Sequence, residues 1–223
     1  MQLLPLLSLV PLPLALAAPS SSALVARQQN SNAAPTLLSS SQVTAFQDPA
    51  HWAEASYCNP QIGNTVNTAQ VLYAAGDGRD IPRVYVAYSS SKDTIVVSHQ
   101  GTNTSSLASI ENDIDIAADS PDPRLAGCVP AGSKIHSGFQ DTWAQTADDV
   151  LAAVMSAQAS HPSASVLVTG HSLGAAISAI DAAYLKCKGV SDVTTTLFGQ
   201  PRTGNYIFAS SLSLTHLGNY AGE

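Results

Sequence analysis

The chain is poor in charged residues, and in basic ones above all. Charged side chains make up 11% of its 223 residues, with nine Lys and Arg against 16 Asp and Glu, for a net charge of −7. The few cations are scattered, so the sequence offers no basic patch and argues against a nucleic-acid partner. The acidic balance also argues against general attraction to anionic membranes. Any contact with lipid would therefore have to be hydrophobic and local.

Metal-binding motifs and an even set of cysteines are also lacking. Neither Cys-x-x-Cys nor His-Glu-x-x-His occurs among the cysteines and the six histidines, which argues against a metal site. The three cysteines are Cys58, Cys128 and Cys187, so that one thiol is left over if two of them pair. In a secreted protein the leftover thiol would pair outside this chain, or its partner is missing from the sequence.

Long hydrophobic runs are confined to the N-terminus. Residues 3–18 are apolar and end in small residues before Pro19, which resembles a secretory leader with its cleavage site. Three prolines within this run suit a membrane-spanning helix poorly. We predict a signal peptide over residues 1–18, an extracellular location, and a flexible spacer or pro-segment over residues 19–35. Residues 36–223 then form a single domain.

That domain is apolar enough to fold, since hydrophobic residues make up 45% of the chain. Short β-branched runs predict strands over residues 83–88, 94–98, 166–168 and 194–198, the first two joined as a hairpin. Apolar residues at helical spacing predict helices over residues 42–57, 137–160 and 175–186. The later elements alternate as a βαβ unit with a right-handed crossover. The predicted fold class is α/β, with a mostly parallel central sheet flanked by helices.

Residues 168–174, Val-Thr-Gly-His-Ser-Leu-Gly, contain the pattern Gly-x-Ser-x-Gly around Ser172. The predicted strand before it and helix after it supply the context of a nucleophile elbow. The turn must hold Ser172 in a strained conformation, and the two glycines leave no Cβ to collide with the strand and helix. We predict Ser172 as a catalytic nucleophile, with the Leu173 N–H directed at a developing oxyanion. An ordinary glycine-rich turn is the alternative.

A second oxyanion donor should come from a loop after an earlier strand. Residues 98–103, Ser-His-Gln-Gly-Thr-Asn, close the strand predicted over residues 94–98. Gly101 permits a sharp turn there, and Thr102 offers both its N–H and its hydroxyl. Taken alone, a plain turn after a strand fits these residues equally well.

Four motifs together resemble the fungal class 3 lipases, in the family's order and spacing over roughly residues 40–210. They are Val-Ser-His-Gln-Gly-Thr at 97–102, His-Ser-Gly-Phe at 136–139, the elbow at 168–174 and Phe-Gly-Gln-Pro-Arg-Thr-Gly-Asn at 198–205. The resemblance implies an alpha/beta-hydrolase fold with Ser172 as nucleophile. It makes the N–H groups of Thr102 and Leu173 the oxyanion hole.

The same resemblance implies a short lid over residues 105–115, which are rich in Ile, Leu and Asp. A lid with apolar residues inward and acids outward would open at an oil–water surface. The predicted lid residues are Ser105, Leu107, Ile110 and Ile114.

The base and its carboxylate do not follow the family pattern. In the family the acid follows a Thr-His-x-x-Asp motif and the catalytic histidine lies further on. Here the motif ends in Asn219, and His216 is the only histidine after Ser172. Three explanations stand: a truncated or mis-spliced lipase, a short form in which His216 serves as base, or an inactive relative that binds lipid or protein. His216 and Asn219 are therefore candidate triad remnants.

The sequence thus predicts a secreted carboxylic ester hydrolase that forms a serine acyl-enzyme, with triacylglycerol lipase as the main interpretation. Its substrate would be a lipid or other ester, it would need no cofactor, and it would act as a monomer. A feruloyl-type esterase on the same scaffold is the alternative among enzymes, although an apolar lid favours a lipase. A non-catalytic lipid-binding relative is the alternative in another class.

Overall fold

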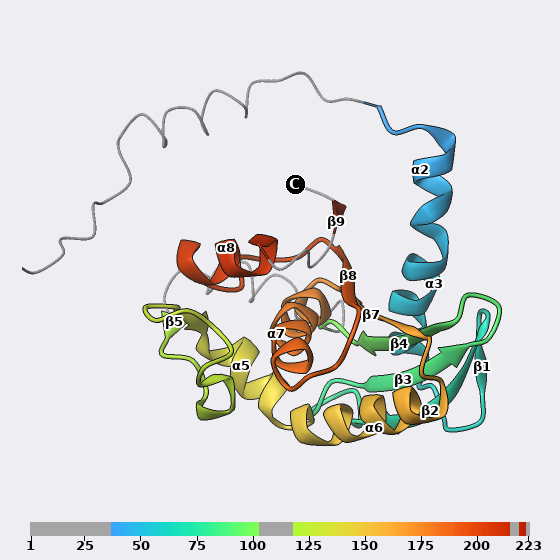
Figure 1. The fold of residues 1–223 in the computed structure, drawn as a ribbon, viewed down its shortest axis with the longest axis horizontal. Coiled ribbons are helices and arrows are strands. Elements are labelled where there is room, and N and C mark those ends of the chain that lie inside the picture. The colour runs from blue at the N-terminus through green and yellow to red at the C-terminus, as the bar shows by residue number, and fades with distance from the viewer. Residues whose placement is uncertain (1–36, 103–117, 215–218, 222–223) are drawn as a thin grey trace, which may run out of the picture. The chain divides into compact units, whose positions relative to one another are not determined.

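The computed structural model of the protein describes residues 37–102, 118–214 and 219–221. The second of two units into which the chain divides begins at Ser40. Within the second unit, the described residues form one seven-stranded sheet in the order β1-β2-β3-β4-β7-β8-β9 (Figure 1). The limits predicted for the leader, the spacer and the domain stay predictions.

The sheet is antiparallel in its first half and parallel in its second. The antiparallel strands are β1 (Thr65–Val66), β2 (Ala69–Ala75), β3 (Val84–Ser89) and β4 (Thr94–His99). Parallel to β4 run β7 (Ser165–His171), β8 (Val193–Phe198) and β9 (Asn219–Ala221). The predicted hairpin and the predicted α/β architecture are confirmed. A separate pair is formed by β5 (Ala118–Asp119) and β6 (Ile135–His136).

Helices cover both faces of the sheet. On one face lies α3 (Gln47–Ala55), preceded by α2 (Ser40–Ala45) and followed by the 3₁₀ turn η1 (Ser56–Cys58). The other face carries α5 (Ser137–Ala144), α6 (Ala147–Ser160) and α7 (Leu173–Cys187). The remaining described elements are the 3₁₀ turn η3 (Pro123–Leu125) and α8 (Tyr206–Leu214).

The alternation of side chains along the central strands produces these two layers. Along β4, Ile95 and Val97 belong to the cluster beneath α5, α6 and α7, whereas Val96 belongs to the cluster beneath α3. All three are fully buried. The continuous apolar run in the sequence is thus explained by burial on both faces.

Two of the predicted helices are broken. The helix predicted over residues 42–57 divides into α2 and α3 at Phe46, because Pro49 has no N–H to donate to the Ala45 carbonyl one turn earlier. The helix predicted over residues 137–160 divides at Thr146, which has φ −128°. The buried residues of α5 and α6 still follow one helical period, which explains why the sequence pattern predicted a single helix.

No helix within the described residues is both long and apolar enough to cross a membrane. The longest, α7, has 15 residues, and it lies against β7 and β8 (Figure 1). Its small residues let its backbone approach the sheet closely.

Candidate active site

The ends of three parallel strands meet at one edge of the sheet. The register places His99, the last residue of β4, beside Gly170 of β7, and β8 runs in step on the other side of β7. Ser172 follows β7 directly, and Thr102 lies three residues beyond the end of β4. Open α/β sheets bind ligands at the carboxyl ends of their strands. The predicted nucleophile and the predicted oxyanion turn therefore share the edge at which a site is expected.

Ser172 adopts the strained conformation that the sequence predicts. It has φ 56° and ψ −125° at the junction of β7 and α7. A non-glycine residue at such a φ costs about 1–3 kcal/mol, so the surrounding structure must impose it. Its N–H donates to the Phe198 carbonyl at 2.9 Å, and its carbonyl accepts from the N–H groups of Ala175 and Ala176. These bonds fix the turn from both sides.

The two glycines of the elbow are required by packing. A Cβ on Gly170 would lie 2.5 Å from the carbonyl carbon of Gly174 and 2.9 Å from Ser178 Oγ. A Cβ on Gly174 would overlap the His99 carbonyl oxygen and lie 2.8 Å from the Gln100 carbonyl carbon. The first glycine lets α7 approach β7, and the second lets the turn after β4 approach the start of α7.

Two hydrogen-bond donors flank Ser172. Leu173 is the first residue of α7, so its N–H has no acceptor within the helix. Thr102 follows Gly101 in the turn after β4, and its hydroxyl is buried without a hydrogen-bond partner among the described residues. Because buried hydroxyls normally find a partner, an unpaired one beside the elbow fits a group that meets a ligand. The roles of Thr102 and Leu173 as oxyanion donors stay predictions.

Ser172 is partly exposed, and its hydroxyl neither donates nor accepts a hydrogen bond within the described residues. His216, a candidate triad remnant and the base in one of the three explanations, lies outside those residues, and its role stays a prediction. The lid also lies outside the described residues; the predicted lid residues are Ser105, Leu107, Ile110 and Ile114.

Asn219 begins β9, where it pairs with Thr196 of β8. Ala221 is the residue that pairs with Phe198, the last residue of β8. The Asn219 backbone therefore lies two residues short of the carboxyl edge of the sheet. A residue that orients a catalytic imidazole is expected beyond that edge. The role of Asn219 as a triad remnant stays a prediction.

His171 directs its imidazole to Tyr57 of η1. Its Nδ1 lies 3.1 Å from the Tyr57 hydroxyl oxygen, which also lies 3.5 Å from the His171 carbonyl oxygen. Burial raises the pKa of Tyr57, and the Gly101 N–H that donates to the Tyr57 oxygen opposes this increase in part. The phenol is protonated at neutral pH, so its oxygen can donate one hydrogen bond and accept another.

A buried polar network lies beneath the site. His99 Nε2 is 3.0 Å from Asp181 Oδ2, and the indole N–H of Trp143 donates to Asp181 Oδ1 at 3.1 Å. The side chains of His99 and Asp181 are 4% and 0% exposed. Sequence patterns gave no signal for this network, because 82 residues separate His99 from Asp181.

This histidine and carboxylate resemble the base and acid of a triad, but their place in the fold differs. Asp181 is eight residues beyond Leu173, which is about 12 Å along the helix axis from the start of α7. His99 is held at that depth by its contact with Asp181. The pair therefore fastens the end of β4 to α7 below Ser172.

The cysteines resolve into one disulfide and one free thiol. Cys128 is bonded to Cys187, 59 residues later, at the end of α7. Cys58 is free and exposed at the end of η1. The predicted disulfide is confirmed, and its pairing, which the sequence left open, joins the loop after η3 to α7.

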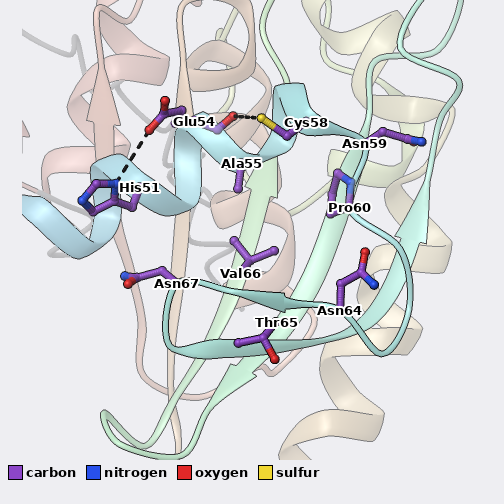
Figure 2. A pocket seen from close by; sticks show the side chains of 10 residues that line it. All are labelled: His51, Glu54, Ala55, Cys58, Asn59, Pro60, Asn64, Thr65, Val66 and Asn67. Carbon is purple, nitrogen blue, oxygen red and sulfur yellow. Dashed lines mark hydrogen bonds and ion pairs between the residues drawn. The ribbon is translucent and has the colours of Figure 1, made fainter.

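A polar pocket of about 590 Å³ opens beside α3 and η1. Figure 2 shows Cys58 and Glu54 at one side of this pocket and Asn64 and Asn67 at the other. Neither Ser172 nor its flanking donors line it. Within the described ranges, no three His, Cys, Asp or Glu side chains gather closely enough to hold a metal ion.

Comparison with known proteins agrees with this geometry. Residues 96–219 match the family model for lipase (class 3). The secreted mono- and diacylglycerol lipase 3 of Gibberella zeae is 35% identical over 213 residues, covering 90% of this chain and 66% of the relative. The secreted mono- and diacylglycerol lipase MDL2 of Malassezia globosa is 36% identical over 169 residues, covering 74% of this chain and 55% of the relative. The chain thus spans between about half and two thirds of the length of these curated relatives.

A solved structure shares the fold. The triacylglycerol lipase of Penicillium expansum superposes with a TM-score of 0.71 at 23% identity, covering 83% of this chain and 70% of that one. At this identity the likeness establishes the alpha/beta-hydrolase fold alone. The family match covers more than half of the residues and includes the elbow, so this chain belongs to the class 3 lipase family.

Proposed function

We propose that this protein hydrolyses carboxylic esters of acylglycerols through an acyl-enzyme on Ser172. The observation that carries the proposal is the elbow itself, with φ 56° at Ser172 between β7 and α7. Beside it lie the Leu173 N–H, which has no acceptor within α7, and the Thr102 hydroxyl, which has no partner in the part of the chain that the structure describes. Structural strain at a serine that is flanked by unsatisfied donors is typical of a nucleophile.

The chemistry follows from these three groups. Ser172 Oγ attacks the acyl carbonyl carbon, and its proton passes to a base that later gives it to the departing glycerol oxygen. The carbonyl oxygen becomes an oxyanion, which accepts hydrogen bonds from the N–H groups of Leu173 and Thr102. Water then attacks the acyl-enzyme ester, releases the fatty acid and restores the Ser172 hydroxyl. No cofactor takes part.

The rate of acyl transfer to Ser172 depends on the base that accepts the serine proton. His216 is our candidate within this chain, with Asn219 as the residue nearest the acid position in sequence. Without a positioned imidazole, the oxyanion hole and substrate binding alone would leave about 10³–10⁴-fold acceleration over water. An Asn in place of the orienting carboxylate would favour the wrong imidazole tautomer, at a cost near 10⁴-fold. Turnover by this chain is therefore expected to be slow unless another carboxylate orients the base.

The relatives' names support the substrate class and the location. Both curated relatives are called secreted mono- and diacylglycerol lipases, which favours acylglycerol substrates over feruloyl esters. By extension, we propose that this chain is also secreted and that residues 1–18 are its leader. The same proposal includes action at an oil–water surface, with residues 105–115 as the lid. It also includes a monomeric state.

Fatty-acid release from emulsified mono-, di- and triacylglycerols tests the proposal. The full secreted chain should release fatty acid, and Ser172→Ala should abolish the release. Ser160→Ala, which removes an exposed hydroxyl at the end of α6, is the matched control and should retain activity. Release that survives in folded Ser172→Ala would refute the proposed nucleophile.

A non-catalytic lipid-binding protein is the second candidate. It is favoured by one observation, the lack of a hydrogen-bonded base for Ser172 within the described residues. In that case the wild-type chain and Ser172→Ala would bind monoacylglycerol micelles equally, and neither would release fatty acid.

A further inference from the structure

Tyr57 occupies the junction between the two halves of the proposed oxyanion hole. It lies in η1, 114 residues before His171 of the elbow. Its hydroxyl oxygen is 3.1 Å from His171 Nδ1 and 3.5 Å from the His171 carbonyl oxygen. The same oxygen lies against Gly101, and the backbone of Gly101 lowers the pKa of the phenol.

The packing around Gly101 shows how closely these groups meet. A Cβ on Gly101 would overlap both the Tyr57 hydroxyl oxygen and the His171 carbonyl oxygen. The turn after β4, the elbow and η1 therefore come together at one point, and the phenol hydroxyl fills it. The position has room for glycine alone.

The neighbours of Gly101 and His171 are the groups proposed to bind the oxyanion. Thr102 follows Gly101 directly, and Leu173 lies two residues after His171. One donor lies in the turn after β4 and the other at the start of α7, and their spacing must match one oxygen atom to within a few tenths of an ångström.

We propose that Tyr57 is a positioning residue whose hydroxyl ties Gly101 to His171 and thereby sets the spacing of the Thr102 and Leu173 donors. This inference rests on the proposed function for its catalytic consequence. The contacts that carry the proposal are those of the Tyr57 hydroxyl with His171 and with Gly101. The Tyr57 hydroxyl lies within hydrogen-bond distance of His171 Nδ1, and the same oxygen packs against Gly101.

A hydroxyl can be removed here with little change in shape. Tyr57→Phe keeps the ring and deletes the link between Gly101 and His171. Tyr88→Phe is the matched control, because it deletes a phenol hydrogen bond to Asp93 at the opposite end of β3. Both variants keep the aromatic ring and lose one phenol hydroxyl, so a general loss of stability should affect them alike.

Two measurements on the full chain separate positioning from stability. The first is amide hydrogen exchange at Gly101 and Thr102, which needs no catalysis. We expect exchange at Gly101 to accelerate by about tenfold or more in Tyr57→Phe and to stay at the wild-type rate in Tyr88→Phe. Wild-type exchange at Gly101 in Tyr57→Phe would overturn the proposal.

The second measurement is the reaction of Ser172 with a fluorophosphonate, followed against reagent concentration. We expect Tyr57→Phe to lower the maximal labelling rate by about tenfold or more while the half-saturating concentration stays within about twofold. A Tyr57→Phe chain that labels at the wild-type maximal rate would refute the positioning role. If the wild-type chain is not labelled at Ser172, the proposed function fails by itself, and Gly101 exchange still decides whether Tyr57 holds the turn.

Discussion

His99 Nε2 lies 3.0 Å from Asp181 Oδ2, which joins the last residue of β4 to the middle of α7. Both side chains are buried, and the Trp143 indole completes the carboxylate's hydrogen bonds. Since Gln100 and Gly101 follow His99 directly, this pair determines where the proposed oxyanion turn begins.

Removal of one partner should leave the other buried without compensation. We predict that Asp181→Asn or His99→Ala lowers the free energy of unfolding by about 3–5 kcal/mol, as measured by urea denaturation. The folded fraction of each variant should still react with a fluorophosphonate at Ser172, because the pair supports the sheet and does not serve as the base. Complete loss of labelling in folded His99→Ala, with stability unchanged, would instead identify His99 as the base.

The strain at Ser172 predicts an unusual order of stabilities. Glycine adopts a φ of 56° without a steric penalty, whereas alanine does not. We predict that Ser172→Gly unfolds with a free energy about 1 kcal/mol higher than Ser172→Ala, although both variants lack the nucleophile. Thermal unfolding of the two variants side by side measures the difference. Equal stabilities would mean that the elbow stores no strain.

The disulfide should stabilise the fold, and the free thiol should not. The Cys128–Cys187 bond closes a loop of 59 residues, for which the loop-entropy model gives about 4 kcal/mol. We predict that Cys128→Ser together with Cys187→Ser lowers the free energy of unfolding by about 2–4 kcal/mol. Cys58→Ser is the matched control, because Cys58 is exposed and unbonded, and it should unfold as the wild type does. A thiol reagent should titrate one cysteine in the native wild-type chain.

Acid should weaken the contact between α6 and the elements around it. The Tyr184 hydroxyl and the Arg124 guanidinium both donate to Asp148, and they lower the pKa of its carboxyl. A carboxyl with a lowered folded-state pKa stabilises the fold above its unfolded pKa of about 3.9, and the stabilisation is lost as the pH falls through the folded value.

Asp148→Asn should therefore make unfolding less dependent on pH below about pH 5. Urea denaturation at several values between pH 3 and pH 7 measures this dependence. The matched control is Asp141→Asn, which removes an exposed carboxylate from α5. A wild-type slope in Asp148→Asn would contradict the assignment.

Local patterns predicted the catalytic half of the fold well. Gly-x-Ser-x-Gly between a strand and a helix predicted the positive φ of Ser172, because few other arrangements require two glycines at that spacing. The break at Phe46 was not predicted, although Pro49, which cannot donate within a helix, was a local signal for it. The break at Thr146 had no such signal, because the apolar period continues across it.

Features that depend on long-range contacts could not be predicted from the sequence. Strand β2 went unpredicted because a bulge between Val71 and Tyr73 interrupts its alternation. The contact of Tyr57 with His171 joins residues 114 apart, and no local pattern marks either residue as a partner of the other. No local pattern marks the buried carboxylate of Asp181 as a partner of His99 either, because the helix around Asp181 consists mostly of small and apolar residues.

The most direct test of the central claim is to map the site of fluorophosphonate labelling. The full chain is treated with the reagent, digested and analysed by mass spectrometry, with Ser172→Ala and Ser160→Ala alongside. Our account predicts one phosphonylated residue, Ser172, in the wild type and in Ser160→Ala, and no label in Ser172→Ala. A folded wild-type chain that takes up no label, or a label on any other serine, would contradict the claim that Ser172 is the nucleophile.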